Sequence, residues 1–213
     1  MSLSPARTID VARSRLTMAF ANWRSGATTS ERRAYNQTDQ VLLTFDDFAK
    51  PETIDQFLLI LADKRVSAAF FVLGSWANEN SASIEKIRAS GHFIGNHTAT
   101  HQRLRTLNDA AVIDEINNGV PSTLLRPPFG DCDDRIRTLA KNLGYKLALW
   151  TIDSEDWKNL PASMIADRVI RELHPGACIL MHLEGKHTLE ALPSIIDAIR
   201  ADGYTLWSGG IID

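Results

Sequence analysis

Short apolar segments rich in β-branched and aromatic residues alternate with segments of helical periodicity from residue 40 onward. This alternation is typical of βα units, in which parallel strands are connected by helices that pack on the sheet. Seven segments are predicted to be strands: residues 41–45, 68–73, 92–95, 123–126, 146–151, 177–182 and 204–207. The pattern therefore predicts an α/β domain with about seven parallel strands.

Apolar residues recur at spacings of three and four between the predicted strands, as expected for helices with one buried face. The clearest helix lies between Asp133, a suitable N-cap, and Gly144, a suitable C-terminal stop. Three further helices are predicted around residues 54–61, 165–173 and 188–203.

A series of βα units either closes into a barrel or forms an open doubly wound sheet, and both folds place reactive residues at the carboxyl ends of the strands. The turn after the first predicted strand lacks a Gly-x-Gly-x-x-Gly pattern, which argues against a dinucleotide site. A length of 213 residues fits one main domain, predicted over residues 40–213. Residues 1–39 are predicted to be a helical extension, with an amphipathic helix over residues 6–23.

Composition and charge exclude several classes of protein. Lys plus Arg is 23 and Asp plus Glu is 26, with no basic block, which argues against nucleic-acid binding. No apolar stretch approaches the ~20 residues needed for a membrane span. Cys132 and Cys178 lack metal or redox spacing and are predicted to be buried or half-buried thiols. Residues 16–21 are too short for the apolar region of a signal peptide, so a cytoplasmic location is expected by default. A periplasmic or secreted location would follow if a leader had been removed.

Residues that bind metals or transfer protons follow several of the predicted strands. Asp46 and Asp47 end the first one, and neighbouring side chains on a strand reach one site only where the strand is ending. Helix capping is the alternative role for this pair. His97 and His101 are four residues apart, a spacing that lets two imidazoles bind one divalent cation. With one carboxylate they would form a triad that occurs in zinc hydrolases and in non-haem iron oxygenases, which leaves the metal open.

Two further segments combine a reactive side chain with a strand end. Arg126 precedes Pro-Pro-Phe-Gly, a sequence that makes a rigid loop and fixes the arginine beside it, with a merely stiff turn as the alternative. His182 ends an apolar strand, where either a hydrogen-bonded core histidine or a catalytic one is expected.

Together these residues form five motifs that resemble, in order, those of the polysaccharide deacetylases of carbohydrate esterase family 4, which share the NodB homology domain. The motifs are Thr-Phe-Asp-Asp at 44–47, His-Thr-Ala-Thr-His at 97–101, Arg-Pro-Pro-Phe-Gly at 126–130, Asp-Ser-Glu-Asp-Trp at 153–157 and Leu-Met-His at 180–182. The resemblance extends over roughly residues 41–207. It implies a distorted, TIM-barrel-like (β/α) barrel and a metal-dependent deacetylase, a hydrolase of carbon–nitrogen bonds other than peptide bonds.

The resemblance also implies roles for individual residues. It makes Asp47, His97 and His101 the ligands of a divalent metal, with zinc expected, while Asp46 becomes the general base and His182 the general acid. The metal would activate water and polarise the acetyl carbonyl.

Supporting residues are implied in the same way. Arg126 would hold Asp46 ionised and oriented, and Asp153 would do the same for a protonated His182. Three residues would contact the substrate, namely Phe129 through its backbone N–H in the oxyanion site, and Trp157 and Leu180 as walls of the acetyl-methyl pocket. Thr98 is interpreted as a residue that braces the loop through its hydroxyl.

The expected partner is a carbohydrate, with removal of acetyl groups from N-acetylated amino sugars of a chitin- or peptidoglycan-type glycan as the leading function. The chain differs from the family pattern at Leu183, where an acidic residue is frequent, and in a short segment between His101 and Arg126 with a reduced helix around residues 109–117. An amide or imide hydrolase or an O-acetyl esterase of small molecules is the alternative. A non-catalytic carbohydrate-binding protein is a third reading, against which the retained reactive residues argue.

Overall fold

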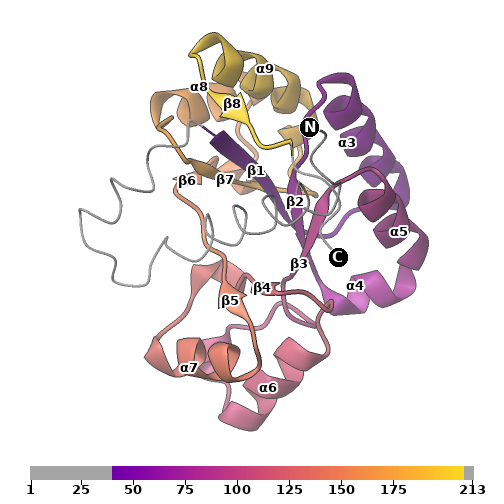
Figure 1. Cartoon of the computed structure of the whole chain (residues 1–213), viewed down its shortest axis with the longest axis vertical. Coiled ribbons are helices and arrows are strands. Elements are labelled where there is room, and N and C mark those ends of the chain that lie inside the picture. The colour runs from indigo at the N-terminus through magenta and orange to yellow at the C-terminus, as the bar shows by residue number, and fades with distance from the viewer. Residues whose placement is uncertain (1–39, 209–213) are drawn as a thin grey trace, which may run out of the picture.

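The structure is a computed structural model that describes residues 40–208, in which a curled parallel sheet is covered by helices (Figure 1). The predicted helix over residues 6–23 lies outside the described residues. The sheet contains β1 (Gln40–Asp47), β2 (Ala69–Val72), β3 (Phe93–Asn96), β4 (Leu124–Leu125), β5 (Lys146–Leu147), β6 (Ile152–Asp153), β7 (Cys178–His182) and β8 (Thr205–Leu206). Their order is β5-β4-β3-β2-β1-β7-β6, with β8 paired to the start of β1. Within the described residues β5 does not pair with β6, so the fold is a distorted, incompletely closed barrel.

β1 occupies the centre of the sheet and separates two apolar clusters. Alternate side chains of a strand point to opposite faces, so Val41, Leu43 and Phe45 pack beneath the outer helices. Leu42 belongs instead to the inner cluster. The same alternation directs Asp46 to the inner side, at the carboxyl end of the strand.

The helices cover the outer face in groups. They are α3 (Pro51–Asp63), α4 (Gly74–Glu79), α5 (Ser81–Ala89), α6 (Asp109–Asn117), α7 (Asp134–Asn142), α8 (Ala162–Arg171) and α9 (Thr188–Ala201). In Figure 1 α8 and α9 lie side by side at one end, and α6 and α7 at the other. Among residues 40–208 there is no helix with the length and apolar character that a membrane crossing requires.

The predicted helix boundaries are confirmed where the sequence offered a cap. The carboxylate of Asp133 accepts a hydrogen bond of 2.9 Å from the N–H of Ile136, and Gly144 after α7 has a φ of +85°. The reduced helix expected around residues 109–117 is confirmed as α6. Helix α3 begins at Pro51 with Lys50 at the N-cap, so the capping alternative for Asp46 and Asp47 is wrong.

All seven predicted strands are present, but the one predicted at residues 146–151 is only β5, over Lys146–Leu147, and β6 follows at Ile152–Asp153, where no strand was predicted. β5 pairs with β4, whereas β6 pairs with β7, at the other edge of the sheet. The residues between them cross the gap, and the carbonyls of Ala148 and Leu149 face the guanidinium of Arg126 at 2.9 and 3.5 Å. These two carbonyls accept hydrogen bonds from the side chain of Arg126, an interaction that the apolar pattern of the sequence does not predict.

Candidate metal and catalytic site

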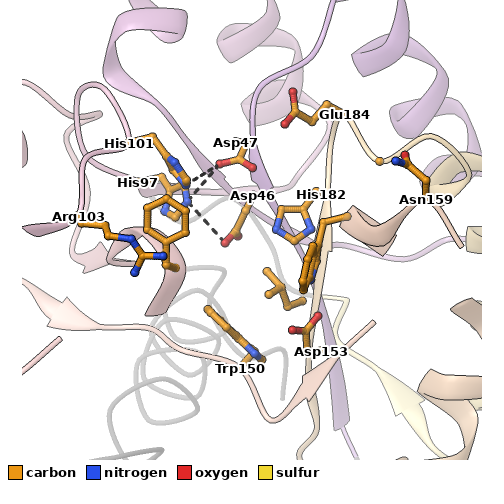
Figure 2. A pocket seen from close by; sticks show the side chains of 14 residues that line it. Asp46, Asp47, His97, His101, Arg103, Trp150, Asp153, Asn159, His182 and Glu184 are labelled. Carbon is orange, nitrogen blue, oxygen red and sulfur yellow. Dashed lines mark ion pairs between the residues drawn. The ribbon is translucent and has the colours of Figure 1, made fainter. Parts of the chain in front are cut away.

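A pocket of about 560 Å³ lies at the carboxyl ends of the strands (Figure 2). It is lined by all the predicted site residues except Arg126, which is buried. Five lining residues were not among those predicted: Arg103, Trp150, Asn159, Glu184 and Gly185.

Several residues of the pocket and of the loop that carries the histidines lie on backbone that departs from regular structure. Asp46 points inward from β1, and Asp47, the next residue, has a φ of +76°, which turns the chain so that both carboxylates line the pocket. Thr98 and His101 also have positive φ, at +67° and +65°. Non-glycine residues rarely adopt this left-handed conformation, and such strain is characteristic of functional sites.

Asp47, His97 and His101 converge on one point, as predicted from their motifs. The Oδ1 atom of Asp47 lies 3.3 Å from Nε2 of His97 and 3.3 Å from Nε2 of His101 (Figure 2). One potential ligand atom from each of these residues lies within 4.8 Å of the others. Asp47 is the last residue of β1, whereas His97 and His101 lie on the loop that follows β3, and β2 pairs with both strands between them.

The hydrogen bonds around these residues fit a cation. The Nδ1 atom of His97 lies 2.7 Å from the carbonyl oxygen of Arg126, so Nδ1 donates to that oxygen and Nε2 is the ring nitrogen directed at Asp47. Among residues 40–208, Oδ1 of Asp47 stands out as a buried side-chain oxygen with no hydrogen-bond partner. A buried carboxylate oxygen facing two imidazole nitrogens is the donor set of a divalent metal site.

The protonation state of His101 agrees with this donor set. Burial lowers the pKa of His101 below its ordinary value despite the opposing charge of Asp47, so the imidazole is neutral and its lone pair is available.

Asp46 forms an ion pair with Arg126, as expected. The Nη1 atom of Arg126 donates to Oδ1 of Asp46 at 2.5 Å and to the hydroxyl of Thr44 at 2.8 Å. The guanidinium is fully buried and stacks 4.0 Å from the ring centre of Phe71. Because Oδ1 of Asp46 is occupied, Oδ2 remains toward the pocket, 3.7 Å from Nε2 of His97.

The carboxylate that orients His182 is Asp156, which corrects the assignment of Asp153. The Nδ1 atom of His182 lies 2.7 Å from Oδ1 of Asp156, and the backbone N–H of His182 donates to Oδ2 at 2.7 Å. The hydroxyl of Thr188 donates to the same oxygen at 2.6 Å. Asp153 lines the pocket, but its Oδ1 accepts the N–H of Glu155 at 2.8 Å, closing a local turn.

The paired Asp156 controls the charge of His182. Burial alone would lower the pKa of the imidazole, but the hydrogen bond and charge of Asp156, with the charges of Asp46 and Asp47, raise it to about 9. The ring is therefore protonated at neutral pH, and Nε2 is the nitrogen left free for the pocket.

The three predicted substrate-binding residues all line the pocket. Phe129 has a φ of +60°, and its ring packs edge-on against His101, 4.6 Å between centroids, beneath the guanidinium of Arg103. Leu180 is buried, whereas Trp157 is 55% exposed. Trp157 is thus a rim residue with much of its ring open to solvent.

Leu183, the departure from the family pattern, is part of the packing around the site. Its side chain is buried in the outer cluster, and its N–H donates to the carbonyl of Asp46 at 3.0 Å. The next residue, Glu184, reaches the pocket, where burial and then the charge of Asp47 raise its pKa. An acidic side chain therefore lines the pocket at residue 184, one position after the residue at which the family pattern has one. Thr98 braces the loop as interpreted, because its hydroxyl accepts the N–H of His101 at 3.2 Å.

Comparison with known proteins identifies relatives with named activities. A family model described as polysaccharide deacetylase matches residues 34–148. The chain is 34% identical to the peptidoglycan-N-acetylmuramic acid deacetylase PdaC of Bacillus subtilis, over 78% of this chain and 37% of that protein. It is 31% identical to a chitooligosaccharide deacetylase of Rhizobium leguminosarum bv. trifolii, over 79% of this chain and 89% of that protein.

A solved structure shares the fold. A CE4 family pseudoenzyme from Bacillus anthracis matches with a TM-score of 0.76 and 29% identity, over 80% of this chain and 64% of that one. The chain therefore spans about two thirds of this structural neighbour and little more than a third of PdaC.

Replacing one imidazole of the converging trio tests the metal site. We expect His97→Ala to lose bound divalent metal after purification, because two remaining side chains give too few ligands for tight binding. Metal content per chain is measured by elemental analysis. The matched control is His187→Ala, a histidine outside the pocket, which is expected to keep the wild-type metal content. Full occupancy in His97→Ala would contradict the assignment.

The pairing of His182 is tested by titrating its ring by NMR in metal-free protein. The wild-type imidazole is expected to titrate near pH 9. Asp156→Asn should lower this value by about 1–3 units, because the opposite charge that favours the protonated ring is removed. Asp153→Asn is the control and should change it little. A large shift in Asp153→Asn with none in Asp156→Asn would restore the assignment made from the motif.

Proposed function

The chain belongs to the polysaccharide deacetylase family, and we propose that it hydrolyses the acetamide groups of N-acetylated amino sugars in a glycan. The relatives named for peptidoglycan and for chitooligosaccharides support this class of substrate. One observation supports the proposal above all others. Asp47, His97 and His101, which could hold a metal ion, line the same pocket as Asp46 and His182, the proposed base and acid.

A divalent cation is the cofactor that the trio fits, and we expect zinc. Asp47, His97 and His101 would hold it through one carboxylate oxygen and two imidazole nitrogens. When bound, such a cation supplies Lewis acidity, which polarises a carbonyl and lowers the pKa of water. Two histidines and one carboxylate with open positions are one of the ligand sets of hydrolytic zinc sites.

Asp46 is positioned to act as the general base. Amide hydrolysis needs a group that takes a proton from the attacking water. Arg126 binds Oδ1 of Asp46, so Oδ2 is the oxygen available to accept this proton, on the same side as His97. The buried arginine also fixes the carboxylate, which reduces the entropy lost on reaching the reactive geometry.

His182 is positioned to act as the general acid. The departing amine must receive a proton before the carbon–nitrogen bond breaks. Nδ1 of His182 is committed to Asp156, so the proton on Nε2 is the one to be transferred. A pKa of about 9 keeps that proton in place at neutral pH.

The remaining pocket residues would bind the acetyl group. The backbone N–H of Phe129 is the proposed donor to the oxyanion, a contact worth about 3 kcal/mol in comparable sites. Leu180 and Trp157 provide apolar surface for the acetyl methyl, and the exposed ring of Trp157 suits contact with a sugar.

The retained reactive residues favour an enzyme over a binding protein. A fold shared with a pseudoenzyme does not establish activity, because function depends on the side chains of the site. Here each proposed reactive atom is free while its neighbour on the same group is hydrogen-bonded. Simple carbohydrate binding requires no such division of roles.

Acetate release tests the substrate class. We expect zinc-loaded protein to release acetate from chitin oligomers or peptidoglycan fragments. Acetylated small esters and cyclic imides are assayed in parallel. Activity confined to the small substrates would favour the alternative hydrolase, and binding without turnover of any of them would favour a non-catalytic protein.

Asp46→Asn separates proton transfer from metal binding. We expect kcat for acetate release to fall by about 100- to 10,000-fold, because the amide cannot accept the proton. Metal content should remain close to wild type, since Asp46 is not one of the converging ligands. The exposed Asp63→Asn is the control and should keep full activity. Loss of metal together with activity would show that Asp46 is a ligand instead.

A further inference from the structure

The loop that carries the two histidines is held by a buried carboxylate outside the pocket. Glu115, on α6, is only 7% exposed and does not line the pocket. Its Oε2 accepts the backbone N–H of Thr100 at 3.0 Å, and its Oε1 accepts the hydroxyl of Thr100 at 2.5 Å. The side-chain amide of Gln102 donates to Oε1 at 3.3 Å. Both oxygens are therefore used by the residues on either side of His101.

The backbone of Glu115 adds a further contact to the same loop. Its carbonyl accepts the N–H of Ala99 at 2.8 Å. Helix α6 is itself fixed, because the side-chain amide of Asn96, at the end of β3, donates to the carbonyl of Ile116 at 2.9 Å. The loop is thus attached to a helix that is anchored at the strand end where the loop begins.

This attachment has a direct bearing on His101. Thr98 and His101 are both in the left-handed conformation, which is unfavourable for residues other than glycine unless the surroundings stabilise it. Thr100 immediately precedes His101, so its fixed N–H and hydroxyl restrict the orientation from which the imidazole projects. Of the two histidines, His101 is the more exposed, at 29% against 2% for the side chain of His97.

We propose that Glu115 is a positioning residue that holds His101, through Thr100, in the orientation required for metal binding. The inference rests on the proposed function, because it assumes that the trio binds a divalent cation. Glu115 is not one of the converging ligands, and both its oxygens already accept hydrogen bonds from the loop. Its effect on the site is therefore indirect.

Titration of the metal-free full chain with Co²⁺ alone measures this effect without an activity assay. Visible absorption of bound Co²⁺ reports the coordination geometry, and competition with a chelator gives the affinity. We expect Glu115→Ala to weaken Co²⁺ binding by about 10-fold or more, as seen when groups supporting metal ligands are removed. At saturation, its Co²⁺ spectrum should also differ from that of the wild type.

Two variants separate hydrogen bonding from charge. Glu115→Gln keeps an oxygen for the N–H of Thr100 and offers its NH₂ to the hydroxyl, so it should retain affinity within about threefold and a wild-type spectrum. Thr100→Val removes the hydroxyl from the loop side and should weaken binding. Combined with Glu115→Ala, it should add no further loss, because both changes remove the same contact.

Val112→Ala controls for general destabilisation of α6. Val112 is fully buried on the same helix and belongs to an apolar cluster that includes neither Thr100 nor His101. This variant should lower the free energy of unfolding and leave the affinity and spectrum of Co²⁺ unchanged. If Glu115→Ala does not fold, Thr100→Val provides the comparison from the loop side.

The outcomes distinguish this inference from the function on which it rests. Wild-type protein that binds no Co²⁺ would overturn the proposed metal site and the role of Glu115 with it. Normal wild-type binding, with Glu115→Ala and Thr100→Val binding Co²⁺ as tightly and with the same spectrum, would overturn the role of Glu115 alone. An equal weakening in Val112→Ala would also overturn it, because the effect would then follow from stability.

Discussion

The buried pair of Arg126 and Asp46 is the interaction on which the site depends. A guanidinium removed from water must be compensated by charge and hydrogen bonds, and here it bonds Asp46, the hydroxyl of Thr44 and the carbonyl of Ala148. These partners lie on β1 and on the segment that crosses the open edge between β5 and β6. The arginine therefore connects the centre of the sheet to the gap in the barrel, and a change that neutralised it would leave a buried carboxylate unpaired.

The main chain of Arg126 also orients His97, one of the three residues that could hold a metal ion. Its N–H donates to the carbonyl of Asn96 at 2.8 Å, and its carbonyl accepts Nδ1 of His97 at 2.7 Å. One residue thus orients the proposed base through its side chain and a proposed ligand through its backbone. The rigid Pro-Pro sequence that follows is consistent with this need, since it limits the movement of the main chain next to Arg126.

Much of this arrangement could be predicted from the sequence, because strands and their ends follow from the apolar pattern, and the five motifs lie at those ends. The assignment of the carboxylate that pairs with His182 was wrong because the side chain of Asp153 accepts a hydrogen bond from the backbone instead. Asp153 and Asp156 are of the same residue type in one motif, and only the turn that uses Asp153 leaves Asp156 to pair with His182. The signal was available, since an aspartate two residues before a turn N–H commonly closes that turn. The role of Glu115 could not be predicted in this way, because its partner Thr100 is 15 residues away in the chain and the sequence of its helix shows no unusual feature.

The reactive groups follow a common rule, in which one polar atom is committed to the protein and the other is left for the pocket. Asp46 gives Oδ1 to Arg126, His97 gives Nδ1 to a carbonyl, and His182 gives Nδ1 to Asp156. Each committed atom fixes a ring or carboxylate plane, and so fixes the direction of the free atom. Oδ1 of Asp47 is also a free atom, because it is buried without a hydrogen bond and faces two imidazole nitrogens. An oxygen left in this state costs free energy in the folded chain, and a cation at the point where the three side chains converge is what would offset that cost.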